Sequence, residues 1–495
     1  MQEQHPHHQR PSRQRYLGLK DFDKNNDIND NRVQYSPRYE SNDLWRTDAV
    51  EAPNALSTAK RRYPLPPLNK FQSKGEYLQQ PLVADYAKGA DKVFFMIKTG
   101  GSVLWNRLPI HLMTSLTRVP SFALYSDAPG SVGGHEVIDI LQNTTKESLQ
   151  KPEFTLYRRQ RYIHDSHGVV DYSELDVKGG WELDKFKNIP MLADAYAKSP
   201  ESDWFVFMDA DSYFMMDTLT EWLKTFDPEQ PHYFGSRAAL GDLIFGHGGS
   251  GVVLSRKAVE LTVGKHPEYV QEYEQKAFKY CCGDALVALM LKEKLGLEIA
   301  VHGGNRFQGN SFWEVMVTPE KWCQPIMSFH HLTAHDIEIL WEYERLMGPE
   351  RRKQITYGDI YHDFYLPYIK ERIDNWDNKA EQVVFTPERD KEKLKEGEEP
   401  PYSSFEACQK ACDEMSNCLM FRYLPNKSYC GLSKQIKLGR PAFEWVKEDN
   451  GNHKAISGWK IDRITQIRKT QSCDPRSKTT HSELHEGWFS PPQLE

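Results

Sequence analysis

The chain has 495 residues, of which 39% are hydrophobic and 12% aromatic, which excludes a wholly disordered chain and suits about two or three domains. Its formal net charge is −7, and 63 basic residues are spread among 70 acidic ones. Because no basic block stands out, we expect no nucleic acid among its partners. The sequence contains no apolar run of about 18 residues, so it predicts no transmembrane helix.

The distribution of polar, apolar and charged residues divides the chain into five segments. Residues 1–84 are polar, rich in Pro and Asn, and predicted to form a disordered stem. Residues 85–378 alternate between strand and helix patterns, and residues 379–400 read as a charged linker. A small cysteine-rich module is expected over residues 401–475, and a polar tail over residues 476–495.

The eight cysteines point to an oxidising compartment. Four crowd together near the C-terminus, and no CxxC pair is present, which argues against a zinc ribbon. Glycosylation acceptor patterns at Asn143 and Asn426 agree with the secretory pathway. The N-terminus has no apolar signal region, so we expect a natural membrane anchor that is absent from this sequence.

The middle of the chain has the pattern of an α/β domain. Apolar runs of buried-strand length occur at residues 93–97, 122–125, 204–208 and 252–254. Helical stretches are expected at residues 104–116, 183–197, from Asp217, after the N-cap Ser255, and at residues 283–295 and 336–347. Strands that alternate with helices predict a mostly parallel sheet with helices on both faces, and ligands bind at the carboxyl ends of such strands.

Two carboxylates follow the third of these strands directly, in the sequence Asp209-Ala210-Asp211. A diphosphate leaving group is strongly anionic, and carboxylate oxygens suit the Mg²⁺ or Mn²⁺ that neutralises it. The competing interpretation is an acidic turn before the helix at Asp217. Because these carboxylates directly follow a buried strand, the metal-site interpretation is about as well supported as the acidic turn.

A glycine-rich loop, Gly246 to Gly251, contains a formal G-x-G-x-x-G pattern. A dinucleotide fingerprint must follow a strand and open a helix, whereas these glycines precede the strand at Val252, so we reject an oxidoreductase on this evidence. We favour a loop that faces substrate over a plain turn.

Two later elements add candidate side chains. In Cys281-Cys282-Gly283-Asp284, the aspartate begins a helix, where it either acts as a general base or only complements the helix dipole. In Ser328-Phe329-His330-His331, a histidine at a strand end suits a metal site, although a lone histidine is more often structural.

Together these elements resemble the Fringe and core-1 β-1,3-galactosyltransferase family, family 31 of the glycosyltransferases, over roughly Lys92 to Met347. The matching pieces are Phe95-Met96-Ile97-Lys98-Thr99, Asp203 to Tyr213, His247 to Ser255, Gly283-Asp284-Ala285-Leu286 and Ser328-Phe329-His330-His331. Each piece is short, and their common order carries the resemblance.

The resemblance implies a GT-A (Rossmann-like) fold, a UDP-sugar donor, Mn²⁺ or Mg²⁺, and an inverting reaction in the Golgi lumen. Metal ligands would be Asp209, Asp211 and His330, and the general base would be Asp284. The nucleotide-sugar would contact Lys98, Thr99, Asp127, Lys187, Asp209, Gly248 and Gly249. Many members of the family have three consecutive acids where this chain has Ala210, which bears on donor preference.

From this resemblance we expect transfer of a hexose, of galactose type or an N-acetylhexosamine, to a hydroxyl of a glycan or glycoprotein acceptor in a β-1,3 linkage. The alternative is an inactive glycan-binding protein with a degenerate transferase domain. The intact set of Asp209, Asp211, Asp284 and His330 argues against such decay.

The cysteine-rich module resembles a PAN/Apple module, an α+β fold, through Cys408, Cys412, Cys418, Phe421 and Cys430-Gly431-Leu432. A short helix is expected over residues 403–415. The family pairing would join Cys408 to Cys430 and Cys412 to Cys418, although the sequence alone allows other pairings. Such modules bind proteins or glycans, so the module either recruits acceptors or is a structural appendage.

Overall fold

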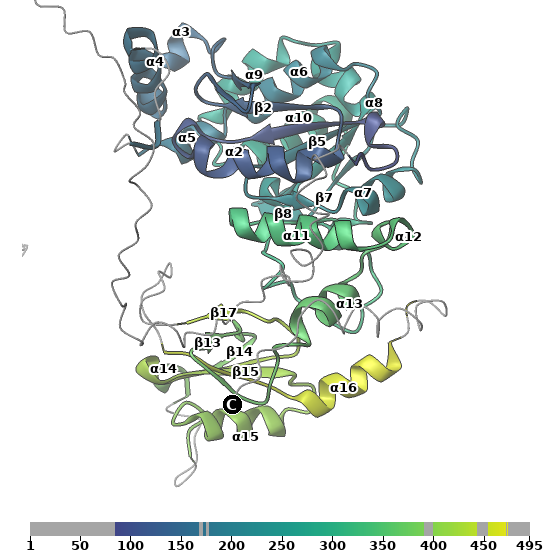
Figure 1. Cartoon of the computed structure of the whole chain (residues 1–495). Helices are drawn as coiled ribbons and strands as arrows, with labels where there is room; N and C mark the ends of the chain where they lie inside the picture. The colour runs from purple at the N-terminus through teal and green to yellow at the C-terminus, as the bar shows by residue number, and fades with distance from the viewer. Residues whose placement is uncertain are drawn as a thin grey trace, which may run out of the picture. The chain divides into compact units, whose positions relative to one another are not determined.

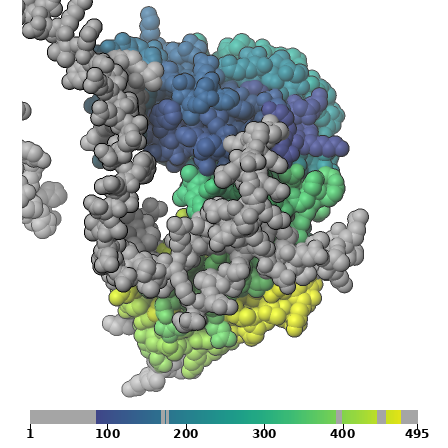
Figure 2. All heavy atoms as spheres, viewed as in Figure 1, coloured from purple at the N-terminus to yellow at the C-terminus, as the bar shows by residue number. Residues whose placement is uncertain are grey.

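The computed structural model describes residues 85–167, 172–174, 178–390, 399–442, 454–471 and 473. The predicted stem and polar tail therefore lie outside the described residues. Among the described helices, none has the length and apolar character needed to cross a membrane. Figure 2 shows the surface of the chain, with the α/β domain in purple to teal and the C-terminal module in light green to yellow.

A seven-stranded sheet forms the centre of the α/β domain, in the order β3-β4-β2-β1-β5-β10-β7 (Figure 1). The strands are β1 (Val93–Lys98), β2 (Phe122–Ser126), β3 (Gly130–Val132), β4 (His135–Asp139), β5 (Trp204–Asp209), β7 (Tyr233–Gly235) and β10 (Val252–Ser255). Strands β4, β2, β1 and β5 are parallel, as predicted, whereas β10 runs antiparallel to β5.

Burial on both faces explains why the strands read as continuous apolar runs. All six residues of β1 are buried. Phe94 and Met96 join the hydrophobic core on one face of the sheet, and Phe95 and Ile97 join the core on the other. This two-sided burial is typical of parallel strands covered by helices.

Helices cover both faces of this sheet. They are α2 (Leu104–Met113), α4 (Thr155–His167), α5 (Gly180–Asp184), α6 (Asn188–Lys198), α7 (Met216–Leu223), α8 (Arg256–Val259), α9 (Tyr269–Ala277) and α10 (Gly283–Leu295), whereas α11 (Ala334–Leu346) packs in a second core. The predicted cap is present, because the Ser255 hydroxyl accepts from the Ala258 N–H at the start of α8. The single helix predicted over residues 183–197 is two helices, and Pro190 lies in the first turn of the second, where a missing N–H costs little.

A second core lies beyond the sheet's carboxyl edge. Strands β6 (Tyr213–Phe214) and β11 (Ser328–Phe329) pair antiparallel, with Phe329 opposite Tyr213. Helix α11 begins two residues earlier than predicted, because Thr333 and Asp336 form a capping box.

The C-terminal module is a five-stranded antiparallel sheet with one helix against it. The sheet order is β12-β18-β15-β16-β14, with β12 (Ile373–Asp374), β14 (Val383–Phe385), β15 (Met420–Leu424), β16 (Tyr429–Ser433) and β18 (Ile456–Trp459). The helix, α15 (Phe405–Glu414), begins after the N-cap Ser404.

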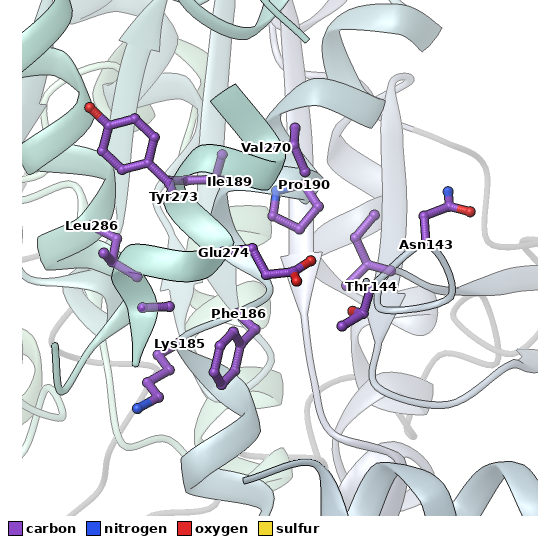
Figure 3. A pocket seen from close by; sticks show the side chains of 12 residues that line it. Asn143, Thr144, Lys185, Phe186, Ile189, Pro190, Val270, Tyr273, Glu274 and Leu286 are labelled. Carbon is purple, nitrogen blue, oxygen red and sulfur yellow. The ribbon is translucent and has the colours of Figure 1, made fainter. Parts of the chain in front are cut away.

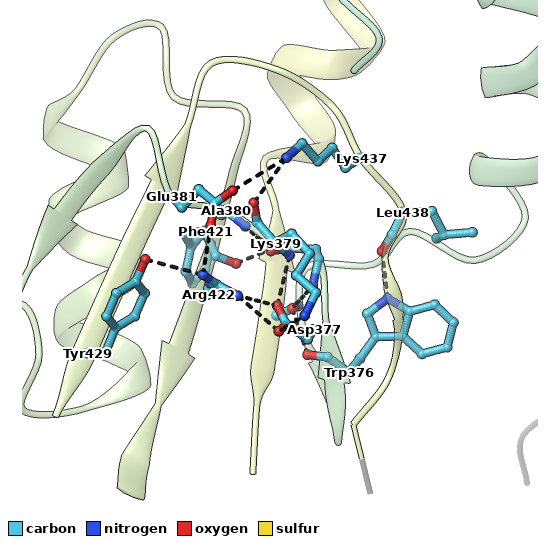
Figure 4. A network of polar contacts seen from close by, with 12 residues as sticks. Trp376, Asp377, Lys379, Ala380, Glu381, Phe421, Arg422, Tyr429, Lys437 and Leu438 are labelled. Carbon is cyan, nitrogen blue, oxygen red and sulfur yellow. Dashed lines mark hydrogen bonds and ion pairs between the residues drawn. The ribbon is translucent and has the colours of Figure 1, made fainter. Parts of the chain in front are cut away.

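The predicted charged linker needs a correction. Val383–Phe385 forms β14 and pairs with β16, so this part of residues 379–400 belongs to the module's sheet. Ile373–Asp374, placed in the first domain by the sequence, pairs with β18. Arg422 of β15 reaches back to Asp377 with hydrogen bonds of 2.8 and 2.9 Å (Figure 4). The charges that follow Phe385 concealed a short apolar edge strand.

All eight cysteines are paired. The pairs Cys408–Cys430 and Cys412–Cys418 confirm the pairing implied by the PAN/Apple resemblance. The other two bonds join Cys323 to Cys473 and the neighbours Cys281 and Cys282.

Candidate active site

Lys98 ends β1 beside the first carboxylate of the D-x-D sequence. The parallel register places Lys98 opposite Asp209 at the carboxyl edge of the sheet. The Lys98 Nζ lies 3.3 Å from Asp209 Oδ1 and 2.6 Å from Oδ2 of Asp184, which ends α5. Burial opposes the charge of this ammonium, but the two carboxylates outweigh it and raise the pKa of Lys98. Lys98 is thus a permanent cation at the strand end.

A second lysine occupies the neighbouring strand end. The Lys187 Nζ lies 2.8 Å from Asp127 Oδ2 and donates to the Thr99 carbonyl at 3.0 Å. Asp127 also accepts from the Gly101 N–H at 2.8 Å, which fixes the loop after β1. The Asp184 carboxylate is 3.7 Å from Lys187 and so links the two lysines. Among the residues that the structure describes, the buried Thr99 hydroxyl has no hydrogen-bond partner, which leaves it free to contact a ligand.

The second carboxylate, Asp211, meets the histidine that follows β11. The pairing of β11 with β6 brings His330 Nε2 to 3.3 Å from Asp211 Oδ1, and Arg107 of α2 lies 3.3 Å from Oδ2. Burial alone would raise the pKa of Asp211, but the hydrogen bond from His330 and the nearby charges bring it to about 2. The carboxylate is therefore ionised throughout the neutral range. The buried Nδ1 of His330 has no hydrogen-bond partner within the described part of the chain.

Asp211, His330 and His331 each offer one ligand atom, and these atoms lie within 4.8 Å of one another. Asp209 is not a member of this group and faces Lys98 instead. A carboxylate with imidazole nitrogens is a donor set that suits Mn²⁺ and related cations.

The glycine-rich loop passes directly over these side chains. A Cβ at Gly249 would lie 2.1 Å from Cε1 of His330, so only glycine fits there. Gly251 has φ 89°, and a Cβ on it would meet the Phe214 ring at 2.2 Å. The loop leads into β10 and precedes no helix of the dinucleotide type. The glycines therefore serve close packing at the site.

Asp284 lies in the first turn of α10, beside the same loop. Its Oδ2 accepts from the Gly248 N–H at 2.7 Å, and its Oδ1 accepts from the Ala285 N–H at 2.8 Å. The carboxylate is half-buried, and its charge contributes to the raised pKa of Lys98. It thus lies at the same end of the sheet as the D-x-D residues and can still be reached from solvent.

Several residues of the site were not predicted. Asp184 bridges both lysines, Arg107 pairs with Asp211, and His331 completes the possible ligand group. His111 contacts the Ala210 carbonyl at 3.0 Å through Nε2, and burial lowers its pKa to about 4. The spacing of Asp184 and Lys187 was the one available signal, because residues three apart meet on a helical turn.

A separate small cavity lies between α6, α9, α10 and the segment after β4 (Figure 3). None of the predicted site residues lines it. The Glu274 carboxylate at its wall accepts from the hydroxyl and backbone N–H of Thr145 and from the Ser148 hydroxyl, so its hydrogen-bonding capacity is used within the protein. We regard the cavity as a packing feature.

Residues 88–304 match the family model described as Fringe-like. The matched range contains the ends of β1 and β5, the glycine-rich loop and Asp284, and it stops before His330. The Fringe-like family is a glycosyltransferase family. The match therefore supports a Fringe-like glycosyltransferase domain in this part of the chain.

Proposed function

We propose that the protein is an inverting, metal-dependent glycosyltransferase. It would move a hexose, of galactose type or an N-acetylhexosamine, from a UDP-sugar to a hydroxyl of a glycan or glycoprotein in a β-1,3 linkage. The observation that carries the proposal is the convergence of the Asp211–His330 pair, two buried lysines and a solvent-reachable Asp284 at one edge of the sheet.

The residues present fit a divalent cation. The Asp211 carboxylate has a pKa of about 2 and is ionised, and His330 keeps a buried ring nitrogen without a partner. Asp211, His330 and His331 would hold Mn²⁺ or Mg²⁺, with Asp209 next to them. When bound, the cation would supply positive charge against the diphosphate of UDP.

Of the remaining residues, some would contact the nucleotide-sugar donor and one would act on the acceptor hydroxyl. Lys98 and Lys187 place positive charge at the strand ends, and the free Thr99 hydroxyl offers a hydrogen bond to the nucleotide. Asp284 would take the proton of an acceptor hydroxyl while that oxygen bonds to the anomeric carbon and UDP leaves from the opposite face. Only one bond forms at that carbon and one breaks, so no covalent enzyme intermediate is required.

We further propose a secretory location, in the Golgi lumen, for this activity. All eight cysteines form disulfides, which persist in oxidising compartments. The C-terminal module would be a PAN/Apple module that binds a protein or glycan ligand. Its two internal disulfides and its helix against an antiparallel sheet support this assignment.

Calorimetric titration of UDP tests the donor site. We expect binding with Mn²⁺, loss of binding with EDTA, and loss in Asp211→Ala. The matched control is Asp462→Ala, which removes an exposed carboxylate from the C-terminal helix α16 (Ile461–Thr470) and leaves the site intact. Absence of UDP binding under every condition would refute an active transferase and leave a glycan-binding protein as the better hypothesis.

A further inference from the structure

Two neighbouring cysteines form a disulfide with each other immediately before α10. The bond joins Cys281 to Cys282, and Cys282 is the N-cap residue of the helix. Cys281 is exposed, whereas Cys282 is half-buried and packs against the core beneath the sheet. The bond closes a small ring that includes the peptide between the two residues. Backbone rotation is therefore restricted at the point where the chain enters α10.

The segment around this ring is also held from both sides. The Tyr280 carbonyl, before the ring, accepts from the Lys185 Nζ at 3.3 Å. After the ring, a Cβ at Gly283 would lie 2.9 Å from the Asn188 side chain, so α10 begins in close contact with the start of α6. Lys185 and Asn188 lie on either side of Lys187 in the chain. The ring thus lies between two contacts with the lysine segment, one made by Tyr280 and one by Gly283.

Asp284 depends on the orientation of this first helical turn. Its Oδ2 meets the Gly248 N–H at 2.7 Å, across from a different segment of the chain. Cys282 makes no side-chain capping hydrogen bond, so the start of α10 lacks the usual polar cap. A change in the direction of the first turn would move the carboxylate away from Gly248.

The bond is poorly suited to a role in global stability. In the chain-entropy account, a disulfide stabilises a fold by closing a loop in the unfolded chain, and the effect grows with loop length. The loop here spans neighbouring residues, with a sequence separation of 1, against 150 for Cys323–Cys473. Its consequence must therefore be local.

We propose that the Cys281–Cys282 disulfide is a positioning element for Asp284. The ring sets the direction of the first turn of α10, so that the carboxylate keeps its hydrogen bond from Gly248 and its place beside the donor site. This inference rests on the proposed role of Asp284 as general base.

Hydrogen exchange tests the positioning without any need for activity. The full chain would be compared with Cys281→Ala/Cys282→Ala, with Cys281→Ser/Cys282→Ser, and with the control Cys412→Ser/Cys418→Ser, which removes a short-loop disulfide within the C-terminal module. We expect the amides of residues 246–250 and 283–287 to exchange about tenfold faster in both variants of the adjacent pair and unchanged in the control. Unchanged exchange in the alanine pair would overturn the proposal. Normal exchange in the serine pair would also overturn it. An ordinary serine N-cap would then hold the first turn of α10 as well as the ring does, and the disulfide would not be required to position Asp284.

Kinetics then separate positioning from general structural damage. With UDP and Mn²⁺ affinity unchanged, kcat should fall about tenfold to a hundredfold in the alanine pair, as expected for a misplaced catalytic group. An unchanged kcat would overturn the proposal. If the wild-type chain binds no UDP, the proposed function fails, and the exchange result still decides whether the ring positions Asp284.

Discussion

Gly249 offers a direct test of the site, because its packing leaves no room for a single methyl group. In Gly249→Ala, the new Cβ would lie 2.1 Å from Cε1 of His330 and 2.4 Å from both ring nitrogens. The ring must then move by about 1 Å to reach an ordinary contact, and displacements of that size impair binding and catalysis. Phe214 and Ser212 restrict the opposite movement of the loop, since the Ser212 hydroxyl donates to the Gly249 carbonyl at 2.7 Å.

Two magnitudes follow for Gly249→Ala. Overpacking of a buried site costs about 1–3 kcal/mol, so the melting temperature should fall by a few degrees. Displacement of His330 should weaken Mn²⁺-dependent UDP binding by about tenfold to a hundredfold, which is the usual effect of disturbing the residues that orient a metal ligand. The matched control is Gly180→Ala, because a Cβ at Gly180 meets no atom within 4 Å.

Differential scanning calorimetry and UDP titration would measure the two effects. The control should melt with the wild type and bind UDP with the same affinity. If Gly249→Ala also melts and binds as the wild type does, the close approach of the loop to His330 is wrong, and with it the reasoning that assigns the glycine to this contact.

Three further changes probe separate parts of the molecule. Asp284→Asn should lower kcat by about a hundredfold to ten-thousandfold while UDP binding is retained, measured by sugar transfer and calorimetry. Arg422→Met should lower the free energy of unfolding by about 2 kcal/mol in urea titrations, because the buried Asp377 loses the Arg422 Nη1 that donates to both of its oxygens, although Lys379 still lies 3.0 Å from it. Burial raises the pKa of Asp363 to about 7, so the folded state retains a proton that the unfolded state releases near pH 4. Wild-type stability attributable to Asp363 therefore falls as pH rises from about 4 to 7, and the melting temperature of Asp363→Asn should rise relative to wild type across that range.

The sequence was informative where polar residues suited to a site directly follow a buried strand or begin a helix. Residues 204–208 are apolar without interruption because β5 is buried on both faces, and the D-x-D carboxylates follow at its end. The resemblance carried by the order of the motifs implied that Asp284 and His330 serve the same site as Asp211, and the structure brings these three residues to one edge of the sheet. Strand ends and helix starts leave local signals of this kind in the sequence.

Contacts made through tertiary packing left no comparable signal. Asp184 reaches Lys98 across 86 positions of sequence, and its spacing of three residues from Lys187 gives no indication of that contact. Arg107 lies on α2 and meets Asp211 only because α2 shares a hydrophobic core with β1 and β5. Likewise, β14 is short and is followed by charged residues, so its pairing with β16 is a property of the folded sheet.

Contacts between the two predicted domains are the clearest example of structure that local sequence does not predict. One hydrophobic core contains Tyr213, two residues beyond Asp211, together with Ala380, Met420 and Trp459 of the C-terminal part. Backbone hydrogen bonds of 2.9 Å join Val317 and Ile436 in both directions, and the Cys323–Cys473 disulfide adds a covalent link. A shared hydrophobic core of this kind restricts relative motion of the two regions, unlike domains joined by a flexible linker. The residues that support Asp211 and His330 are therefore stabilised in part by the C-terminal sheet. The module thus contributes to the structure of the site whether or not it also binds a ligand.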